Sequence, residues 1–160
     1  MLADMTTVTV SAAAQDDIGS LVASVAGLFR EDGGRHDPLR DVEWPAREGA
    51  GYYSVLVDDS SCLLALARDG GEVIGHLIGR LHGPGGTFTG CIADLESMRV
   101  APQFRRAGVG SLLVQHFLTW ARERGAQQVS VTAYAANEAA QRFYARHGFV
   151  PSSITSRAPL

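Results

Sequence analysis

Apolar and polar residues alternate in several short stretches of the chain, and other stretches repeat apolar residues at helical spacing. Threonine and valine alternate over Thr6–Val10, which predicts a first strand. Apolar residues then recur every three or four positions over Ile18–Leu28, directly after Asp16 and Asp17, which can cap a helix. The segment Glu31–Asp41 contains two glycines, a proline and four acids, and this composition predicts a loop.

The middle of the chain predicts one short helix followed by strands. Trp44–Leu56 has the pattern of a helix that starts at Pro45 and is interrupted near Gly51. An Asp-Gly-Gly turn joins the first two of the strands that follow, and Pro102 ends the last one. These predicted strands are Cys62–Ala67, Val73–His82 and Thr89–Val100.

The clearest helical pattern lies at Gly110–Arg124, where apolar residues form one stripe and Gly125 stands at the position after the helix. Three further elements are predicted after it: a strand at Gln128–Ala133, a helix from its cap Asn137 to Arg146, and a last strand at Phe149–Thr155. Strands and helices in this order predict a mixed sheet with helices on both faces, in the α/β or α+β class.

Composition limits the classes of protein to consider. A length of 160 residues predicts one domain over residues 1–160, and 46% hydrophobic with 19% charged residues is typical of a soluble globular protein. A net charge of −3 gives no general attraction to nucleic acid or to an anionic membrane. Residues 1–5 lack the basic region of a secretory signal, so we expect a cytoplasmic protein. Cys62 and Cys91 are therefore expected to be buried thiols and not a disulfide.

Residues Arg105–Gly110 read Arg-Arg-Ala-Gly-Val-Gly and lie between a predicted strand and a predicted helix. Two glycines in this spacing permit a tight turn in which several backbone N–H groups point into one concavity. The N-terminus of the next helix adds its positive dipole and its unpaired amides to the same place. A dinucleotide fold would require a third glycine and a later acid, and a Walker loop would require a lysine, which the chain lacks. The turn therefore predicts a pyrophosphate site of another kind.

Two motifs together resemble the GNAT superfamily of N-acetyltransferases. The run Leu95–Pro102, followed by Arg105-x-x-Gly108-x-Gly110, is similar to the coenzyme A loop of that family. Downstream, the residues from Asn137 to Phe149 match the pattern Asn-x-x-Ala-x-x-Phe-Tyr-x-x-x-Gly-Phe. The resemblance covers nearly the whole chain. It implies the GNAT fold, with a mixed sheet of roughly six to seven strands and about four helices, and acetyl-CoA as co-substrate.

The resemblance also implies which residues hold acetyl-CoA. The amides of Arg106–Ser111 would bind the pyrophosphate, and Arg105 with Arg106 would add positive charge. The strand backbone near Met98 would pair with the pantetheine arm, and one of its N–H groups would stabilise the thioester oxyanion. The implied coenzyme site consists of Met98, Arg99, Val100, Arg105, Arg106, Ala107, Gly108, Val109, Gly110, Ser111, Asn137, Ala140 and Tyr144.

Tyr144 is the first of two candidate catalytic residues. It follows Ala140 by one helical turn, and the resemblance implies that it protonates the departing thiolate as general acid. A phenol, with a pKa near 10, suits a thiolate leaving group. The alternative is an aromatic residue that packs with Phe143 and Phe117 at the edge of the core.

Glu96 is the candidate base, because an amine acceptor is an ammonium at neutral pH and must lose a proton before it attacks. Regular alternation would place Asp94, Glu96, Met98 and Val100 on one face of their strand, with Glu96 close to the thioester. The alternative is a carboxylate paired with an arginine such as Arg80, and Asp94 is then the reserve base.

Acids in the predicted loop indicate how an acceptor could be attracted. In the family, the segment between the first two helices forms the lid over the acceptor, and acids there would attract a cationic amine. The alternative is an ordinary solvated loop. The lid acids are Glu31, Asp32 and Asp37, with Asp41 and Glu43 nearby, and they are opposed in the loop only by Arg35 and Arg40.

Three functions are consistent with these residues. The first is direct acetyl transfer from acetyl-CoA to a small amine in a ternary complex; the second is acetylation of a protein N-terminus or side chain. The third is a non-catalytic acyl-CoA sensor, which the retained glycines, tyrosine and candidate base disfavour. The five histidines form no ligand set, so no metal is expected, and no nucleic acid or membrane partner is expected either. A homodimer is consistent with the family, although a short or missing last strand would affect its edge.

Overall fold

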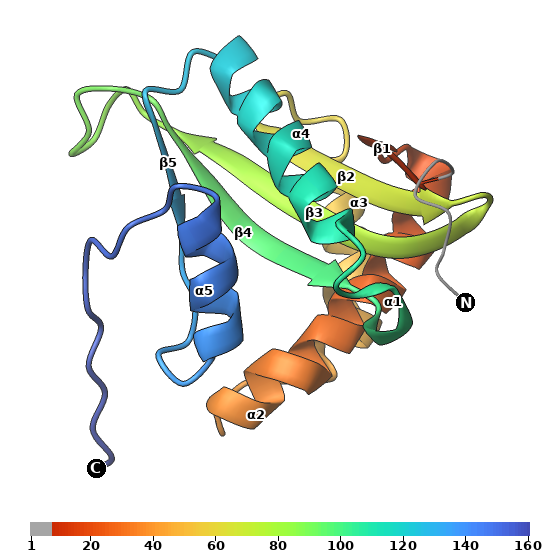
Figure 1. The fold of residues 1–160 in the computed structure, drawn as a ribbon, viewed down its shortest axis with the longest axis horizontal. Helices are drawn as coiled ribbons and strands as arrows, with labels where there is room; N and C mark the ends of the chain where they lie inside the picture. Colours follow the sequence, from red (N-terminus) through yellow and green to blue (C-terminus); the bar gives the residue numbers. More distant parts are fainter. Residues whose placement is uncertain (1–7) are drawn as a thin grey trace.

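The computed structural model describes residues 8–160, which form a twisted sheet of five strands in the order β1-β2-β3-β4-β5 (Figure 1). All neighbouring strands are antiparallel except β4 and β5, which are parallel. The predicted α/β class with a mixed sheet is confirmed, but the described residues form five strands instead of the six to seven expected. The strands are Val8–Ala12 (β1), Cys62–Asp69 (β2), Glu72–His82 (β3), Ile92–Val100 (β4) and Gln128–Val131 (β5).

Helices cover both faces of the sheet (Figure 1). Helix α4 lies on one face, α1 and α3 lie on the other, and α5 lies on the side of β4 where β5 ends. The helices are Ile18–Leu28 (α1), Gly34–His36 (α2), Ala50–Leu56 (α3), Val109–Glu123 (α4) and Glu138–Arg146 (α5).

The sheet separates two apolar cores. Under α4, Leu77 of β3 packs with Leu113 and Phe117, and all three side chains are fully buried. Under α1 and α3, Leu21 packs with residues of β2 and β3, among them Leu66. Two such faces explain the long apolar runs of the central strands, since both sides of each strand are buried.

The N-terminal half contains two corrections to the predicted helices. The loop predicted at Glu31–Asp41 is wrong up to His36, because α1 continues through a π-helical turn, Phe29–Gly33, directly into α2. The interruption predicted near Gly51 is also wrong, since a π-helical turn at Pro45–Gly49 leads without a break into α3. The predicted start at Pro45 is confirmed.

The strand predicted at Phe149–Thr155 is wrong, because the chain is irregular after α5. Phe149 packs against the core under α4, but Val150 and Ile154 are exposed and no strand of residues 8–160 pairs with them. The strand predicted to start at Thr89 begins at Ile92. Of the first predicted strand, the described part starts at Val8; Thr6, Thr7 and the N-terminal residues considered for a signal lie outside the described residues.

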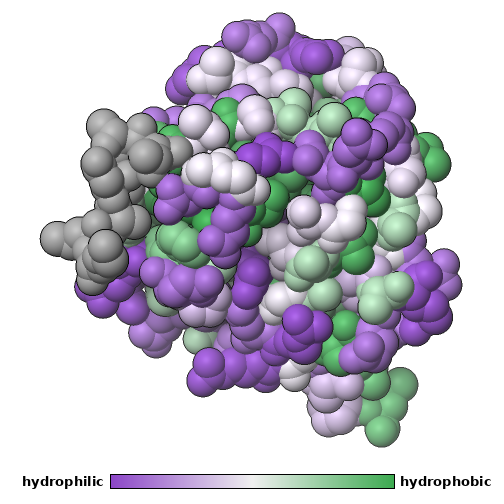
Figure 2. All heavy atoms as spheres, turned by 90° about the vertical axis from the view of Figure 1, so that its right-hand side faces the viewer, coloured by the Kyte–Doolittle hydropathy of each residue, from purple (hydrophilic) through white to green (hydrophobic). Residues whose placement is uncertain are grey.

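Cys62 and Cys91 are free thiols and are half-buried. Within residues 8–160, no helix combines the length and apolar character needed to cross a bilayer. On the face drawn in Figure 2, hydrophilic side chains surround several smaller apolar areas.

Close packing at Gly79 gives the first testable prediction. A Cβ at this position would lie 2.9 Å from two ring carbons of the buried Phe117 and 3.3 Å from the Trp120 ring. We expect Gly79→Ala to lower the free energy of unfolding by about 1–3 kcal/mol, because the core under α4 would be overpacked. Urea unfolding measures the change. Gly71→Ala is the matched control, since a Cβ there meets nothing within 4 Å; equal stability of the two variants would contradict the prediction.

Candidate active site

Strands β4 and β5 separate halfway along β4. They are paired only from Ile92 with Gln128 to Leu95 with Val131, where β5 ends. Strand β4 continues to Val100, and α5 lies beside this second half (Figure 1). In the described residues, the β4 backbone from Glu96 to Val100 therefore has no strand neighbour on that side. Apart from the Val100 carbonyl, which accepts a hydrogen bond from Arg105 Nε, the backbone groups that point to this side are available to pair with an extended ligand.

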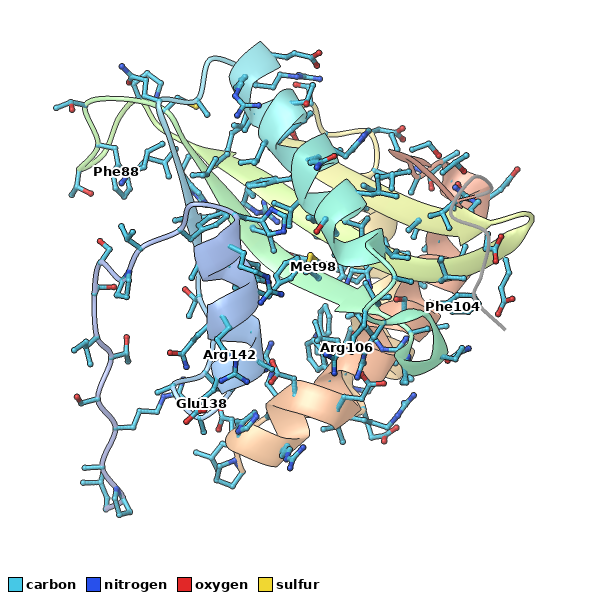
Figure 3. The ribbon with its side chains drawn as sticks, in the orientation of Figure 1. Phe88, Met98, Phe104, Arg106, Glu138 and Arg142 are labelled. Atoms are coloured by element: carbon cyan, nitrogen blue, oxygen red, sulfur yellow. The ribbon has the colours of Figure 1, made fainter. Side chains whose placement is uncertain are left out.

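A bulge in β4 occurs at the point of separation. Gly79 of β3 pairs with Leu95 and the preceding Ile78 pairs with Ser97, so Glu96 is an extra residue in β4. Leu95 and Met98 consequently both pack in the core under α4, as Figure 3 shows for Met98, although simple alternation would place them on opposite faces.

The bulge corrects the expectation that Asp94, Glu96, Met98 and Val100 share a face. Met98 and Val100 pack toward α4, whereas Glu96 points to the face of α1 and α3. There its Oε1 accepts a hydrogen bond of 2.9 Å from Arg80 Nε, and the same guanidinium donates to the Tyr52 hydroxyl of α3. Asp94 lies 2.9 Å from His82 instead. The arginine pairing considered as the alternative for Glu96 is thus present, while its Oε2 accepts no hydrogen bond from the described residues.

The loop before α4 has the backbone of an anion site. Arg106 and Gly108 both adopt left-handed conformations, with φ of 62° and 83°, and Gly108 is the residue that caps α4. Left-handed residues in a short turn direct successive N–H groups into a common concavity, which continues into the unpaired amides of the first helical turn. Gly110 has a different reason to be glycine: a Cβ there would lie 3.1 Å from the Phe143 ring, so it permits α4 and α5 to pack closely.

The two arginines of the loop have different environments. Arg105 Nε donates to the Val100 carbonyl at 2.8 Å and its guanidinium pairs with Glu31, so the side chain is held against the end of β4. Arg106 is exposed in the loop before α4 (Figure 3), and no ion pair with another described residue engages it. Of the two arginines expected to add charge for a pyrophosphate, Arg106 is the one whose side chain is available.

Helix α5 carries Tyr144, and Asn137 caps its N-terminus. Asn137 Oδ1 accepts from the Ala140 N–H at 3.1 Å, which confirms the predicted cap, and its Nδ2 donates to Asp32 at 2.9 Å. Tyr144 packs edge-on against Phe143 and belongs to the rim of the core under α4. Burial, with a smaller effect of the Asp32 charge, raises the pKa of Tyr144 to about 12, so its hydroxyl keeps its proton at neutral pH.

The acids of the expected lid are paired with basic or amide groups inside the chain. Glu31 binds Arg99 and Arg105, Asp32 binds Asn137, and Asp37 binds Arg157 of the C-terminal segment at 2.7 Å. Burial alone would raise the pKa of Glu31, but the hydrogen bonds and charges of Arg99 and Arg105 together outweigh it and hold this pKa below its usual value. The expectation that only Arg35 and Arg40 oppose these acids is therefore wrong, because their partners lie far away in sequence.

A buried polar network, which sequence reasoning did not find, supports the bulged strand. His76 of β3 is fully buried, and its ring nitrogens lie 2.7 Å from Ser24 Oγ of α1 and 2.8 Å from Ser97 Oγ of β4. The sequence does carry a signal for this network, namely a histidine within the apolar run of β3. Weighing the histidines as metal ligands alone overlooks it. Burial, aided by the nearby charge of Arg99, lowers the pKa of His76 to about 3.

The residues present fit a coenzyme with an extended arm and a phosphate group. The unpaired edge of β4 offers backbone groups for the arm, and the loop of Arg106 and Gly108 offers amides for the phosphates. Among residues 8–160, no group of three or more histidine, cysteine, aspartate or glutamate side chains is arranged to hold a metal ion.

Residues 28–149 match the sequence model of a protein family described as the acetyltransferase (GNAT) family. An uncharacterized N-acetyltransferase of Escherichia coli, YedL, is 38% identical over 58 residues, which cover 35% of this chain and 36% of YedL. The chain thus matches about a third of the length of that curated relative.

Solved structures share the fold over almost the entire chain. A transcriptional regulator from Bacillus halodurans has a TM-score of 0.78 at 26% identity, covering 96% of this chain and 99% of that one. An aminoglycoside acetyltransferase from an uncultured soil metagenomic sample, in complex with trehalose, has a TM-score of 0.75 at 13% identity, covering 98% of each chain. At that identity, the second likeness establishes the fold alone.

The buried histidine makes a prediction about stability and pH. His76 is neutral in the folded protein, whereas the unfolded chain binds a proton near pH 6.5, so stability falls as pH decreases below 6.5. We expect His76 to contribute a slope of up to about 1.4 kcal/mol per pH unit. Urea unfolding between pH 7 and about 5, where carboxylates stay ionised, measures it. In His76→Gln this part of the slope should disappear; parallel curves for the two proteins would contradict the assignment.

Proposed function

The chain belongs to the acetyltransferase (GNAT) family, and from this premise we propose that it transfers the acetyl group of acetyl-CoA to a small, cationic primary amine by direct attack in a ternary complex. The observation that carries the proposal is the free edge of β4 from Glu96 to Val100, which ends at the anion-binding loop before α4. A cofactor arm and its phosphates would need these two features side by side.

Each part of the coenzyme has a group in this chain to bind it. Bound acetyl-CoA supplies the activated acetyl thioester. The amides of Arg106–Ser111 and the Arg106 side chain bind its pyrophosphate. Arg105 instead fixes the loop to the end of β4 through its hydrogen bond to the Val100 carbonyl. The β4 backbone from Met98 to Val100 pairs with the arm, and an N–H near Met98 donates to the thioester oxygen as negative charge develops there.

Glu96 acts as the base for the acceptor. It lies at the bulge, one residue beyond the last pairing of β4 with β5, on the face of α1 and α3. Arg80 orients the carboxylate through Oε1, and Oε2 is available to take the proton of the ammonium, directly or through a water molecule. With Met98 facing α4 and Glu96 facing the opposite side, the acceptor approaches from the side of α1 and α3 while the coenzyme occupies the gap beside α5.

Tyr144 acts as the general acid. Its pKa of about 12 keeps the phenol protonated, and none of the described residues accepts a hydrogen bond from its hydroxyl. The C–N bond forms as the C–S bond breaks, and the proton of Tyr144 passes to the sulfur. Tyr144 recovers its proton from solvent or from the proton released at the amine.

A primary amine is a cation at neutral pH, so the acceptor need not carry a second charge. Because the lid acids are paired, their charge alone does not select a polycation. Aminoglycoside acetyltransferases with this fold are one reason to test such amines. The test is thiol release from acetyl-CoA with polyamines, aminoglycosides, amino acids and peptides. Release with one class of small amine supports the proposal; release with peptides alone favours a protein acetyltransferase, and coenzyme binding without release favours a sensor.

Replacing the proposed acid gives a kinetic prediction. We expect Tyr144→Phe to lower kcat about 10²-fold or more while the KM for the amine stays similar, because only protonation of the leaving thiolate is lost. Steady-state thiol release measures both constants. Phe143→Leu, next to Tyr144 on the same helix, is the control for altered packing. Full turnover by Tyr144→Phe would remove the tyrosine from the mechanism.

Replacing the proposed base gives a pH-dependent prediction. We expect Glu96→Gln to lower kcat about 10²-fold at pH 7, because the glutamine cannot take the amine proton. The deficit should shrink as pH approaches the pKa of the amine, near 10, where the acceptor arrives already deprotonated. Rates from pH 7 to about 9.5 measure the trend. An unchanged rate for Glu96→Gln, with a loss for Asp94→Asn, would move the role to Asp94.

A further inference from the structure

Two successive acids on the lid, Glu31 and Asp32, contact two elements that would flank the arm of the coenzyme: β4, beyond the point where β5 ends, and the start of α5. The separation of these two elements is called the gap here. Both lie in the π-helical turn Phe29–Gly33 that joins α1 to α2. Consecutive residues of a helix point in different directions, so one side chain reaches β4 and its neighbour reaches α5. Single π-helical turns inside α-helices are frequent at functional sites.

Glu31 holds the β4 side of the gap. Its Oε1 accepts two hydrogen bonds from Arg99, at 2.6 Å from Nη2 and 3.2 Å from Nε, and its Oε2 pairs with Arg105. Arg105 in turn donates to the Val100 carbonyl at the end of β4. The Arg99 guanidinium occupies the space where a side chain at Gly27 would lie, since a Cβ there would be 2.5 Å from its central carbon. A glycine in α1 thus makes room for this ion pair.

Asp32 holds the α5 side of the gap. Its Oδ1 accepts 2.9 Å from Asn137 Nδ2, and His36 Nε2 lies 3.5 Å from the same oxygen. Asn137 uses its other side-chain atom, Oδ1, to cap α5 through the Ala140 N–H. Both polar atoms of the Asn137 side chain are therefore engaged within the chain. The charge of Asp32 also contributes to the raised pKa of Tyr144, which places it near the phenol proposed to act as acid.

We propose that Glu31 and Asp32 form a clasp that sets the separation of β4 and α5, and so prepares the gap for the pantetheine arm of the coenzyme. They are positioning residues: they touch Arg99, Arg105 and Asn137, and these hold the walls of the gap. The inference rests on the proposed coenzyme site and deepens it. It replaces attraction of the acceptor, the role expected of these lid acids, with the geometry of the donor site.

The clasp makes a specific statement about which part of the coenzyme is affected. A gap whose width is already set lowers the free-energy cost of binding the pantetheine arm. The phosphates, in contrast, are bound at the loop of Arg106 and Gly108. Loss of the clasp should weaken binding of coenzyme A and of pantetheine, which lacks the pyrophosphate, by the same factor. Loss of Arg106 should weaken coenzyme A alone.

The experiment compares Asp32→Ala, Asn137→Ser and the double variant. Serine keeps the helix cap but is too short to reach Asp32, so the single variants remove the same contact in two ways. We expect each to bind coenzyme A and pantetheine about tenfold more weakly, measured by calorimetry and NMR titration. The double variant should be no weaker than either one, because the two residues act through one hydrogen bond.

Two control variants accompany these. Glu138→Gln, beside Asn137, removes an exposed carboxylate whose partner is Arg142 on the same helix (Figure 3), and should bind both ligands as the wild type does. Arg106→Ala should lose affinity for coenzyme A only. Thermal unfolding shows that each variant is folded at the temperature of measurement.

The outcomes separate the clasp from the proposed function. A wild-type protein that binds neither coenzyme A nor pantetheine would overturn the proposed function, and the clasp with it. Wild-type binding with unchanged affinities in Asp32→Ala would overturn the clasp alone. Additive losses in the double variant would do the same, since they would mean that Asn137 contacts the arm directly and independently of Asp32.

Discussion

Strand β4 carries one extra residue relative to β3 at Glu96, and it leaves β5 immediately before that residue. The extra residue turns Glu96 and Ser97 toward α1, whereas Met98 returns to the core under α4. The same stretch of backbone has no strand neighbour on the side of α5 among the described residues. A donor beside α5 and an acceptor beside α1 would therefore meet at one point of β4, as the proposed direct transfer requires.

Polar contacts from the α1 side hold this stretch of β4 in place. His76 and Ser24 secure Ser97, Arg80 orients Glu96, and Glu31 pairs with Arg99. A buried polar group is costly unless it is hydrogen-bonded, so the contacts of the fully buried His76 with Ser24 and Ser97 favour one arrangement of the strand. The second half of β4 is paired with β3 but, among the described residues, has no strand on its other side, and these side-chain contacts help to order it.

Local patterns failed where a distant contact decides the structure. The sequence predicts a last strand at Phe149–Thr155, but a strand exists only beside a neighbour, and no described strand lies beside this segment. Residues 31–36 have the glycines and acids of a loop, yet they are helical, and Glu31 and Asp32 bind Arg99 of β4, Arg105 in the loop before α4 and the α5 cap Asn137. In both cases the deciding contact, or its absence, involves residues far away in the chain and cannot be read from a short window of sequence.

The sequence by itself determined the α/β class, the order of the strands from β1 to β5 and the cap at Asn137, because periodicity and capping are local and act within a few residues. It also indicated the family, through the resemblance of two motifs. It also identified Glu96 and Tyr144 as candidates. Only the tertiary structure decided the face on which Glu96 lies, that Arg106 and not Arg105 is available at the loop, and that the lid acids are paired. These features depend on strand register and on contacts between residues far apart in the chain, and one residue of register reverses a strand's faces.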